Sequence, residues 1–284
     1  MTATYEFTHW DSPIAQVAGV LVAGTDETDL IPIGTGFFCA PNLALTARHV
    51  VDEIFVRFEK CLPTKAVGQV SFGLQLAHWR DGALRKWDVV AYGYSASIDI
   101  AALVLEPAAP LPNGFSWILP RFETLPPALG ERVAAFGYPR SSHRVTEEGA
   151  AKIGLDPRTA TGSVIEIHPR QRDGYFLPFP CFRTDAQFDG GISGGPVFNA
   201  AGRICGLVSS NLPPENPDGE HVSYVSLIWP ALGLRLRRSL DTPSEPTEPY
   251  FLKELAVDGQ MQVLNANMVM VKEGDEKDDV RFGG

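Results

Sequence analysis

The chain contains the stretch DGGISGGPVF (189–198), which decides how the rest of the sequence is interpreted. Ser193 stands there between two glycine pairs, Gly190–Gly191 and Gly194–Gly195. Glycine has no Cβ to crowd the serine, and it permits a tight backbone path that aims successive N–H groups at one point. Such a turn can present a serine nucleophile beside an oxyanion hole made by the amides of Gly191 and Ser193. Glycine-rich serine turns are also common as ordinary loops, so the motif indicates a nucleophile only if further catalytic residues accompany it.

Two candidate partners occur upstream. His49 lies in LALTARHVV (43–51) after an apolar run, and Asp99 lies near the start of the apolar stretch SIDIAALVLE (97–106). Each is weak alone, because a lone histidine is more often a hydrogen-bonded structural residue and a strand-edge aspartate is more often a cap or turn residue. Together with Ser193 they form the order His, Asp, Ser, with gaps of 99 − 49 = 50 and 193 − 99 = 94 residues. This order predicts a general base, a carboxylate that orients it and a nucleophile.

Short apolar segments separated by turn residues recur along the chain. They are mostly rich in Val, Ile, Phe and Tyr and are bounded by Gly, Pro, Asn or Asp, as strands and turns are. The stretch NAAGRI (199–204) adds a hairpin signal directly after the serine motif. We therefore expect an all-β fold with little helix. The segments are 15–24, 33–47, 54–58, 87–94, 100–106, 132–139, 161–169, 195–210 and 222–228.

The folded unit is expected to end near residue 240. The stretch WPALGLRLRRS (229–239) has leucines at helical spacing, so we expect a C-terminal helix over 229–240. Residues 241–284 are expected to form a Pro-rich linker and a partly disordered tail. Within this tail, residues 250–271 are amphiphilic enough to add a strand or short hairpin, whereas the charged residues 272–284 are expected to be disordered.

Four longer stretches enclose the motifs: GTGFFCAPNLALTARHVV (34–51), LGERVAAFGYPR (129–140), TGSVIEI (161–167) and RTDAQFDGGISGGPVFNAAGRICGL (183–207). They resemble the chymotrypsin-like (trypsin-like) serine peptidases, and the bacterial HtrA-type proteases more than the digestive enzymes. The resemblance covers roughly residues 14–232 and does not extend to the tail, where 284 − 240 = 44 residues are too few for a PDZ domain.

This resemblance implies a fold and a mechanism. The fold is a protease domain over residues 1–240, with two six-stranded Greek-key β-barrels at about 10–112 and 113–228. The mechanism is that of a serine endopeptidase, which hydrolyses peptide bonds through an acyl-enzyme. Ser193 is then the nucleophile, His49 the general base and Asp99 the residue that orients the imidazole.

The same resemblance places the substrate-binding residues. Gln187 falls at the base of the primary specificity pocket, where a neutral amide argues against strict cleavage after Lys or Arg. Phe188 and Asp189 fall on the wall and rim of that pocket. Ser226, in SYVSLI (223–228), falls on the strand expected to pair with the substrate peptide.

One departure from the family concerns Ile192, the residue before the nucleophile. Trypsin-like enzymes that are activated by proteolysis carry an aspartate at this position, which pairs with a newly formed N-terminal ammonium. An isoleucine rules out activation by such a salt bridge, and it leaves open what holds the oxyanion loop. A catalytically inactive protease fold used as a binding or scaffold module is therefore the alternative reading. A latent protease that is triggered by a regulatory protein partner is intermediate between the two.

Composition limits the partners and the compartment. A formal net charge of −10 argues against nucleic acid or an anionic membrane as the main partner, which leaves peptide or protein substrates. No Cys/His cluster has zinc spacing, so we expect no metal and no cofactor. The N-terminus has no signal-peptide pattern, and the four cysteines read as reduced, mostly buried residues. We expect a cytoplasmic protein.

Overall fold

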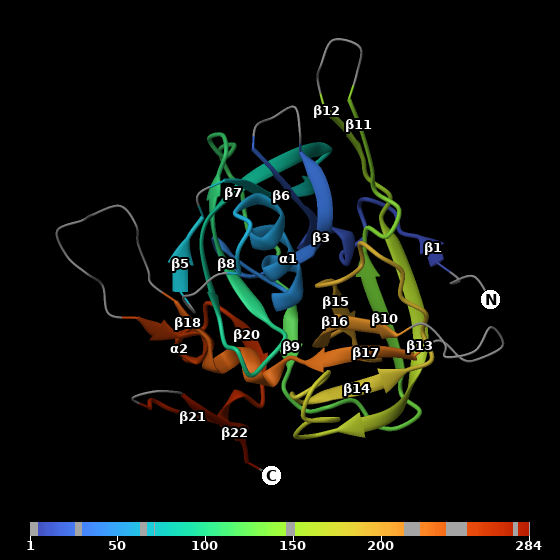
Figure 1. Ribbon diagram of the computed structural model, residues 1–284, viewed down its shortest axis with the longest axis vertical. Coiled ribbons are helices and arrows are strands. Elements are labelled where there is room, and N and C mark those ends of the chain that lie inside the picture. Colours follow the sequence, from blue (N-terminus) through green and yellow to red (C-terminus); the bar gives the residue numbers. More distant parts are fainter. Residues whose placement is uncertain are drawn as a thin grey trace.

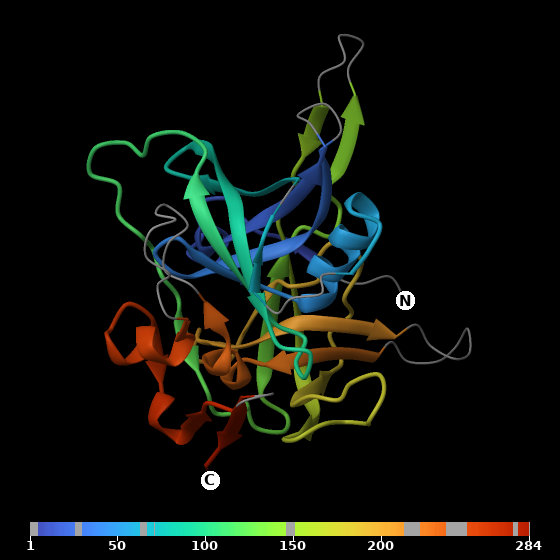
Figure 2. The same cartoon turned by 60° about the vertical axis from the view of Figure 1, so that its left-hand side comes forward.

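Strands dominate the computed structural model, as the short apolar segments predict. The structure describes residues 5–25, 30–62, 67–70, 72–145, 151–212, 222–236, 249–274 and 278–283. Figures 1 and 2 show two barrels, one built from the blue-to-green part of the chain and the other from the yellow-green-to-orange part.

In the first barrel each of six strands pairs with two neighbours, so the sheet closes on itself. Side chains from these strands fill the interior, and Leu21, Phe37, Leu45, Leu76 and Trp87 are fully buried there. The strands, in chain order, are β2 (Ala18–Gly24), β3 (Ile31–Ala40), β4 (Leu43–Thr46), β6 (Gly73–Arg80), β7 (Ala83–Tyr94) and β8 (Ala101–Pro107).

The second barrel repeats this connectivity. Counted within either barrel, the strands follow one another around the ring in the order first, second, third, sixth, fifth, fourth. The expected pair of six-stranded barrels is therefore confirmed. The hairpin expected at 199–204 is also present, between β15 and β16. The strands are β10 (Arg132–Gly137), β13 (Arg158–His168), β14 (Cys181–Thr184), β15 (Pro196–Phe198), β16 (Ile204–Leu212) and β17 (Val222–Leu227).

Several short strands extend these barrels. Strand β5 (Val67–Gln69) pairs with β7, and β11 (Ser142–Val145) and β12 (Ala151–Gly154) form a hairpin that projects from the molecule (Figure 1). Strand β9 (Arg121–Glu123), in the connection between the barrels, pairs with β16 in parallel. Strand β1 (Tyr5–Phe7) adds to the outside of the second barrel by pairing with β13.

Helix α1 (Arg48–Phe58) follows β4 and corrects one expectation. The segment 54–58, read as part of an all-β pattern, is the second half of this helix. Its buried residues Val50, Val51, Ile54 and Phe55 recur at helical spacing, which appears only when the residues before 54 are included. A five-residue apolar window does not distinguish a buried strand from one face of a helix.

The helix expected over 229–240 is present only in part, and residues 237–240 lie outside the described residues. The structure has a 3-10 helix at Trp229–Gly233, followed by β18 (Arg235–Leu236), which pairs with β19 (Tyr250–Phe251). Leu234 and Leu236 are buried on either side of a half-buried Arg235, which is the period of a strand. The helix near the C-terminus is instead α2 (Leu252–Val257).

The tail packs against the body of the protein. Strand β20 (Gln262–Leu264) pairs with β9 in parallel, as expected for an added strand, and a 3-10 helix follows at Ala266–Met268. Strands β21 (Val269–Lys272) and β22 (Asp279–Phe282) form a hairpin, so the expectation of disorder over 272–284 is wrong for the residues in β22. Val280 packs on Gly233. This apolar contact holds β22 in place, and the charged composition of the segment does not predict it. Most of the expected linker 241–249 lies outside the described residues.

Candidate active site

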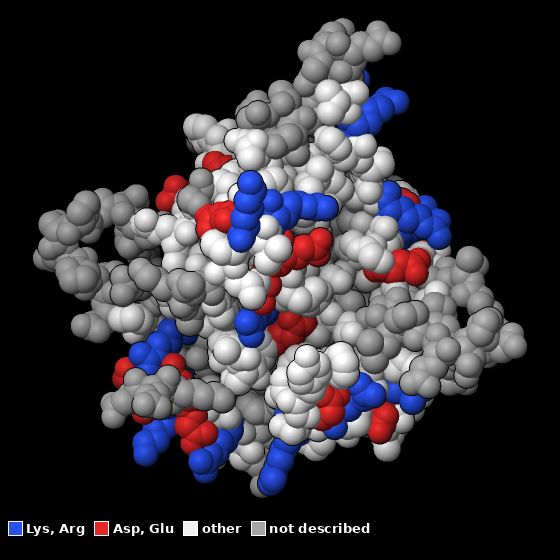
Figure 3. All heavy atoms as spheres, viewed as in Figure 1, with Lys and Arg blue, Asp and Glu red and all other residues white. Residues whose placement is uncertain are grey.

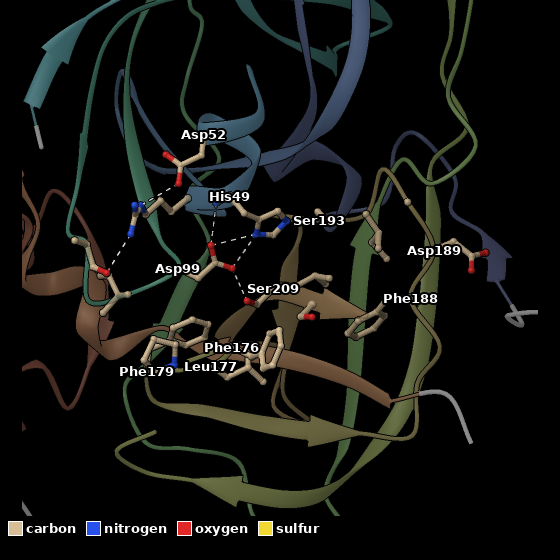
Figure 4. A pocket seen from close by; sticks show the side chains of 18 residues that line it. His49, Asp52, Asp99, Phe176, Leu177, Phe179, Phe188, Asp189, Ser193 and Ser209 are labelled. Atoms are coloured by element: carbon tan, nitrogen blue, oxygen red, sulfur yellow. Dashed lines mark hydrogen bonds and ion pairs between the residues drawn. The ribbon is translucent and has the colours of Figure 1, made fainter. Parts of the chain in front are cut away.

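Asp99 and His49 are joined at the edge of the first barrel, at the face seen in Figure 4. His49 is the second residue of α1, and Asp99 lies in the loop just before β8. The Nδ1 atom of His49 lies 2.9 Å from Oδ2 of Asp99, and the backbone N–H of His49 donates to Oδ1 at 3.0 Å. Because the first amides of a helix have no partner within the helix, Asp99 caps α1 and fixes the imidazole with one carboxylate.

A third group also contacts this carboxylate. The hydroxyl of Ser209, on β16 of the second barrel, donates to Oδ2 of Asp99. Asp99 is 8% exposed and receives hydrogen bonds from both barrels, so its position is strongly constrained. Ser209 was not predicted as a site residue, and its place in the apolar run after the serine motif is the only available signal.

The charge of Asp99 sets the protonation of the histidine. Burial lowers the pKa of His49, but the charge of Asp99 and its hydrogen bond raise it more, so the pKa lies above the usual value. This coupling holds Nδ1 against the carboxylate and leaves Nε2 for contacts within the cleft. Figure 4 shows Ser193 beside the imidazole.

These residues line one cleft of about 660 Å³ between the two barrels. His49 and Asp99 come from the first barrel, and Ser193 comes from the turn before β15 in the second. Figure 3 shows acidic atoms recessed at the centre of this face, with Lys and Arg scattered around it among other acidic groups. The part of the chain that the structure describes holds no group of three His, Cys, Asp or Glu side chains that could bind a metal.

The turn at 189–195, called the nucleophile turn because it carries the expected nucleophile Ser193, leaves three amides without an acceptor among the described residues, those of Gly190, Gly191 and Ser193. The N–H groups of Ile192, Gly194 and Gly195 donate to backbone carbonyls, those of Asp189, Val208 and Ile192 respectively. Within the described residues, the amides of Gly191 and Ser193 donate to none.

Glycine is required on both sides of Ser193. Gly191 has φ = 89° and Gly194 has φ = 79°, in the left-handed region. A Cβ at Gly191 would also lie 2.7 Å from the carbonyl oxygen of Tyr138. The turn therefore presents two free donors, at Gly191 and Ser193, next to the serine hydroxyl.

Thr35 on β3 holds this turn from the other barrel. Its backbone N–H donates to the carbonyl of Ser193 at 2.9 Å, and its hydroxyl donates to the carbonyl of Gly191 at 2.9 Å. The same hydroxyl accepts the N–H of Tyr138, at 3.3 Å. Ile192 is 1% exposed and packs on Gly137, so apolar contact takes the place that an ion pair would occupy. Thr35 was missed in the sequence, although its position between two glycines in GTG (34–36) is the available signal.

The structure separates the expected substrate-binding residues into two groups. Phe188 and Asp189 line the cleft. Gln187 is half-buried and does not line it, and Ser226 is buried within β17. The expectation for Ser226 is corrected, because the strand at the cleft is β16, through Val208, Ser209 and Ser210.

An apolar wall closes one side of the cleft. The turn that carries it is fixed by Asp173, whose Oδ1 accepts the amides of Tyr175, Phe176 and Leu177 at 2.8, 2.6 and 3.3 Å. These hydrogen bonds lower the pKa of Asp173. The wall consists of Phe176, Leu177, Pro178 and Phe179.

A family model matches more than half of the chain. The family model described as a trypsin-like peptidase domain matches residues 34–207, more than half of the chain, and this interval includes His49, Asp99 and Ser193. The chain belongs to the trypsin-like peptidase family.

Solved structures similar to this trypsin-like peptidase include two bacterial proteases. The Rv3671c protease from M. tuberculosis in its active form is 18% identical, with 75% of this chain and 77% of that chain covered and a TM-score of 0.46. The MamO protease domain from Magnetospirillum magneticum (apo form) is 18% identical, with 78% and 95% covered and a TM-score of 0.48. No curated protein sequence matches the chain. Among the described residues of this peptidase, no helix is long and apolar enough to cross a membrane.

Replacing Thr35 by Val is expected to destabilise the peptidase. The change leaves the Gly191 carbonyl and the Tyr138 N–H without their partner, at a cost of roughly 1–3 kcal/mol for each buried group. Thr35→Ser keeps the hydroxyl and is the matched control. Urea unfolding of the three proteins measures the difference, and equal stability of the Val and Ser variants would contradict the role of the hydroxyl.

Proposed function

We propose that the protein is a serine endopeptidase, with Ser193 as nucleophile, His49 as general base and Asp99 as the group that orients the base. The observation that carries the proposal is the link from Asp99 to His49 Nδ1, in a cleft that also holds Ser193. Nε2 then takes the proton of Ser193 as Oγ attacks a peptide carbonyl carbon, and passes it to the leaving amine. Water, deprotonated by the same nitrogen, releases the acyl group from Ser193.

The free amides of Gly191 and Ser193 are proposed to receive the negative charge that develops on the substrate oxygen. Support comes from the amides of Ile192, Gly194 and Gly195, which are engaged in backbone hydrogen bonds. Donors held in advance, in a site that excludes water, stabilise the transition state more than the ground state. Asp99, fixed from three sides, stabilises the imidazolium that forms when His49 takes the proton.

The substrate is proposed to lie along β16. The Val208 carbonyl accepts the amide of Gly194, and the Val208 amide donates to the carbonyl of Gly195. Strand β17 pairs with the other edge of β16. Beyond Val208 no described strand pairs with the edge at the cleft, where Ser209 and Ser210 lie. A peptide can add there by main-chain hydrogen bonds.

A reducing, cytoplasmic location is also part of the proposal. Cys39 and Cys181 are free and buried, and burial raises the pKa of each thiol to about 12. Such thiols stay protonated and behave as small apolar side chains.

Covalent labelling tests the proposed activity. A fluorophosphonate probe is expected to label the wild-type protein and not Ser193→Ala, because only a serine activated by His49 attacks the phosphorus. Gel fluorescence measures the adduct. Labelling only after a cell extract is added indicates a latent enzyme, triggered by a protein partner. Absence of labelling under both conditions contradicts the endopeptidase and leaves the binding module.

The acid–base behaviour of His49 gives a second test. Its pKa is expected above the ordinary value of about 6.5 in the wild type, because the charge of Asp99 outweighs burial. In Asp99→Asn burial remains and the charge is gone, so the pKa is expected to fall below that value. NMR titration of the His49 ring protons in both proteins measures this. Equal pKa values in the two would contradict the coupling.

Apolar residues on the substrate are expected to contact the wall at 176–179. Phe176→Ala is expected to raise KM for peptides with Leu or Phe near the cleavage site by about 5- to 10-fold, with a smaller change in kcat. Tyr175→Ala is the matched control, because Tyr175 lies next to Phe176 and does not line the cleft. Steady-state kinetics on a peptide series measures the effect. An equal rise in both variants, or in neither, would rule out the subsite.

A further inference from the structure

The N-terminal strand β1 reaches the nucleophile turn from outside the second barrel. Tyr5 stands opposite Ala160 in the pairing of β1 with β13, and its phenol oxygen accepts a hydrogen bond from the backbone N–H of Asp189. Figure 4 shows Asp189 beside the ribbon of this strand, at the opposite end of the turn from His49. Asp189 also lines the cleft, so the contact connects the N-terminal segment to the site.

The residue that follows this contact, Gly190, has little stiffness of its own. Gly190 and Gly191 follow Asp189, and a Cβ at Gly190 would meet no atom within 4 Å, so packing does not restrain it. The carbonyl of Asp189 accepts the N–H of Ile192, which closes the turn around the two glycines. The position of Asp189 therefore influences where the Gly191 amide points.

The turn is held at its two ends by different elements. Thr35 fixes its second half, through the carbonyls of Gly191 and Ser193. At the first half, the amide of Phe188 donates to Ser223 and the amide of Asp189 donates to Tyr5. Tyr5 thus supplies the last external restraint before the glycine pair.

The N-terminal segment is itself anchored beyond the strand. The backbone N–H of Thr8 donates to the carbonyl of Pro157, and its hydroxyl lies 2.6 Å from that of Thr159. The ring of Trp10 lies 6.3 Å from that of Tyr138, whose carbonyl is next to Gly191. Burial raises the pKa of Tyr5, so its hydroxyl stays neutral and available as an acceptor.

We propose that Tyr5 is a positioning residue for the oxyanion hole, and that strand β1 holds the nucleophile turn in the place of an N-terminal salt bridge. This inference rests on the proposed peptidase function. Because the Gly191 amide is used only when charge develops on the substrate oxygen, loss of the Tyr5 hydroxyl acts on the chemical step more than on substrate binding.

The test is Tyr5→Phe in the full-length protein, which keeps the ring and removes the acceptor. A roughly 10-fold or greater loss of kcat is expected, with KM changed by less than about 2-fold. Phe7→Leu is the control, since Phe7 lies on the same strand with its side chain 55% exposed. A rise in KM at constant kcat, or equal loss in both variants, overturns the inference.

Hydrogen exchange provides a readout that does not need activity. In Tyr5→Phe the amides of the peptide spanning 188–195 are expected to exchange faster than in wild type and in Phe7→Leu, while peptides from β13 stay unchanged. If exchange at the turn is the same in all three proteins, the inference fails. A wild type that no fluorophosphonate labels rejects the peptidase function instead, and the exchange comparison still decides whether Tyr5 holds the turn.

Discussion

The hydrogen bonds of Thr35 to the nucleophile turn are the constraint on which the site depends. His49 and Asp99 belong to one barrel and Ser193 to the other, so their relative position is set by contacts across the cleft. Thr35 is fully buried on β3 of the first barrel and binds the carbonyls on both sides of Ile192 in the second. The peptide groups of those two carbonyls carry the amides of Ile192 and Gly194, which are themselves hydrogen-bonded, whereas the amides of Gly191 and Ser193 have no acceptor among the described residues.

A second set of contacts, around Asp99, determines the charge environment of His49. Asp99 receives the imidazole and the backbone amide of His49 from its own barrel, and the hydroxyl of Ser209 from the other. A buried carboxylate is costly unless hydrogen bonds replace the lost water, and these three donors do so. Burial lowers the pKa of His49, and its charge interaction and hydrogen bond with Asp99 raise it above the usual value.

The nucleophile turn is held in place without an ion pair at position 192. The isoleucine side chain is packed on Gly137, Thr35 binds the turn at its second half, and Tyr5 binds it at its first half. All three contacts are present in the folded chain without cleavage or a new terminus. The C-terminal tail adds further order, because β20 pairs with the strand β9 that connects the two barrels.

The all-β class, the hairpin after the serine motif and the loops that carry Asp99 and Ser193 follow from the sequence alone, whereas His49 lies on helix α1 and not in the expected loop. These features are local: glycine permits special backbone angles at once, and apolar segments between turn residues form strands in many contexts. Short apolar patterns did not predict the type of secondary structure where packing determines it, as in residues 54–58 and 229–236. The order of β22 depends on the contact of Val280 with Gly233.

Which groups meet depends on how the folded strands bring distant parts of the chain together. Ser209 bonds Asp99 across 110 positions of the chain, Thr35 bonds Gly191 across 156, and Tyr5 bonds Asp189 across 184. The choice of β16 over β17 at the cleft likewise depends on strand order in the closed barrel. Residue type does not predict such contacts, because a threonine or tyrosine hydroxyl can form hydrogen bonds with many groups. The closed barrels determine which of these groups lies within reach.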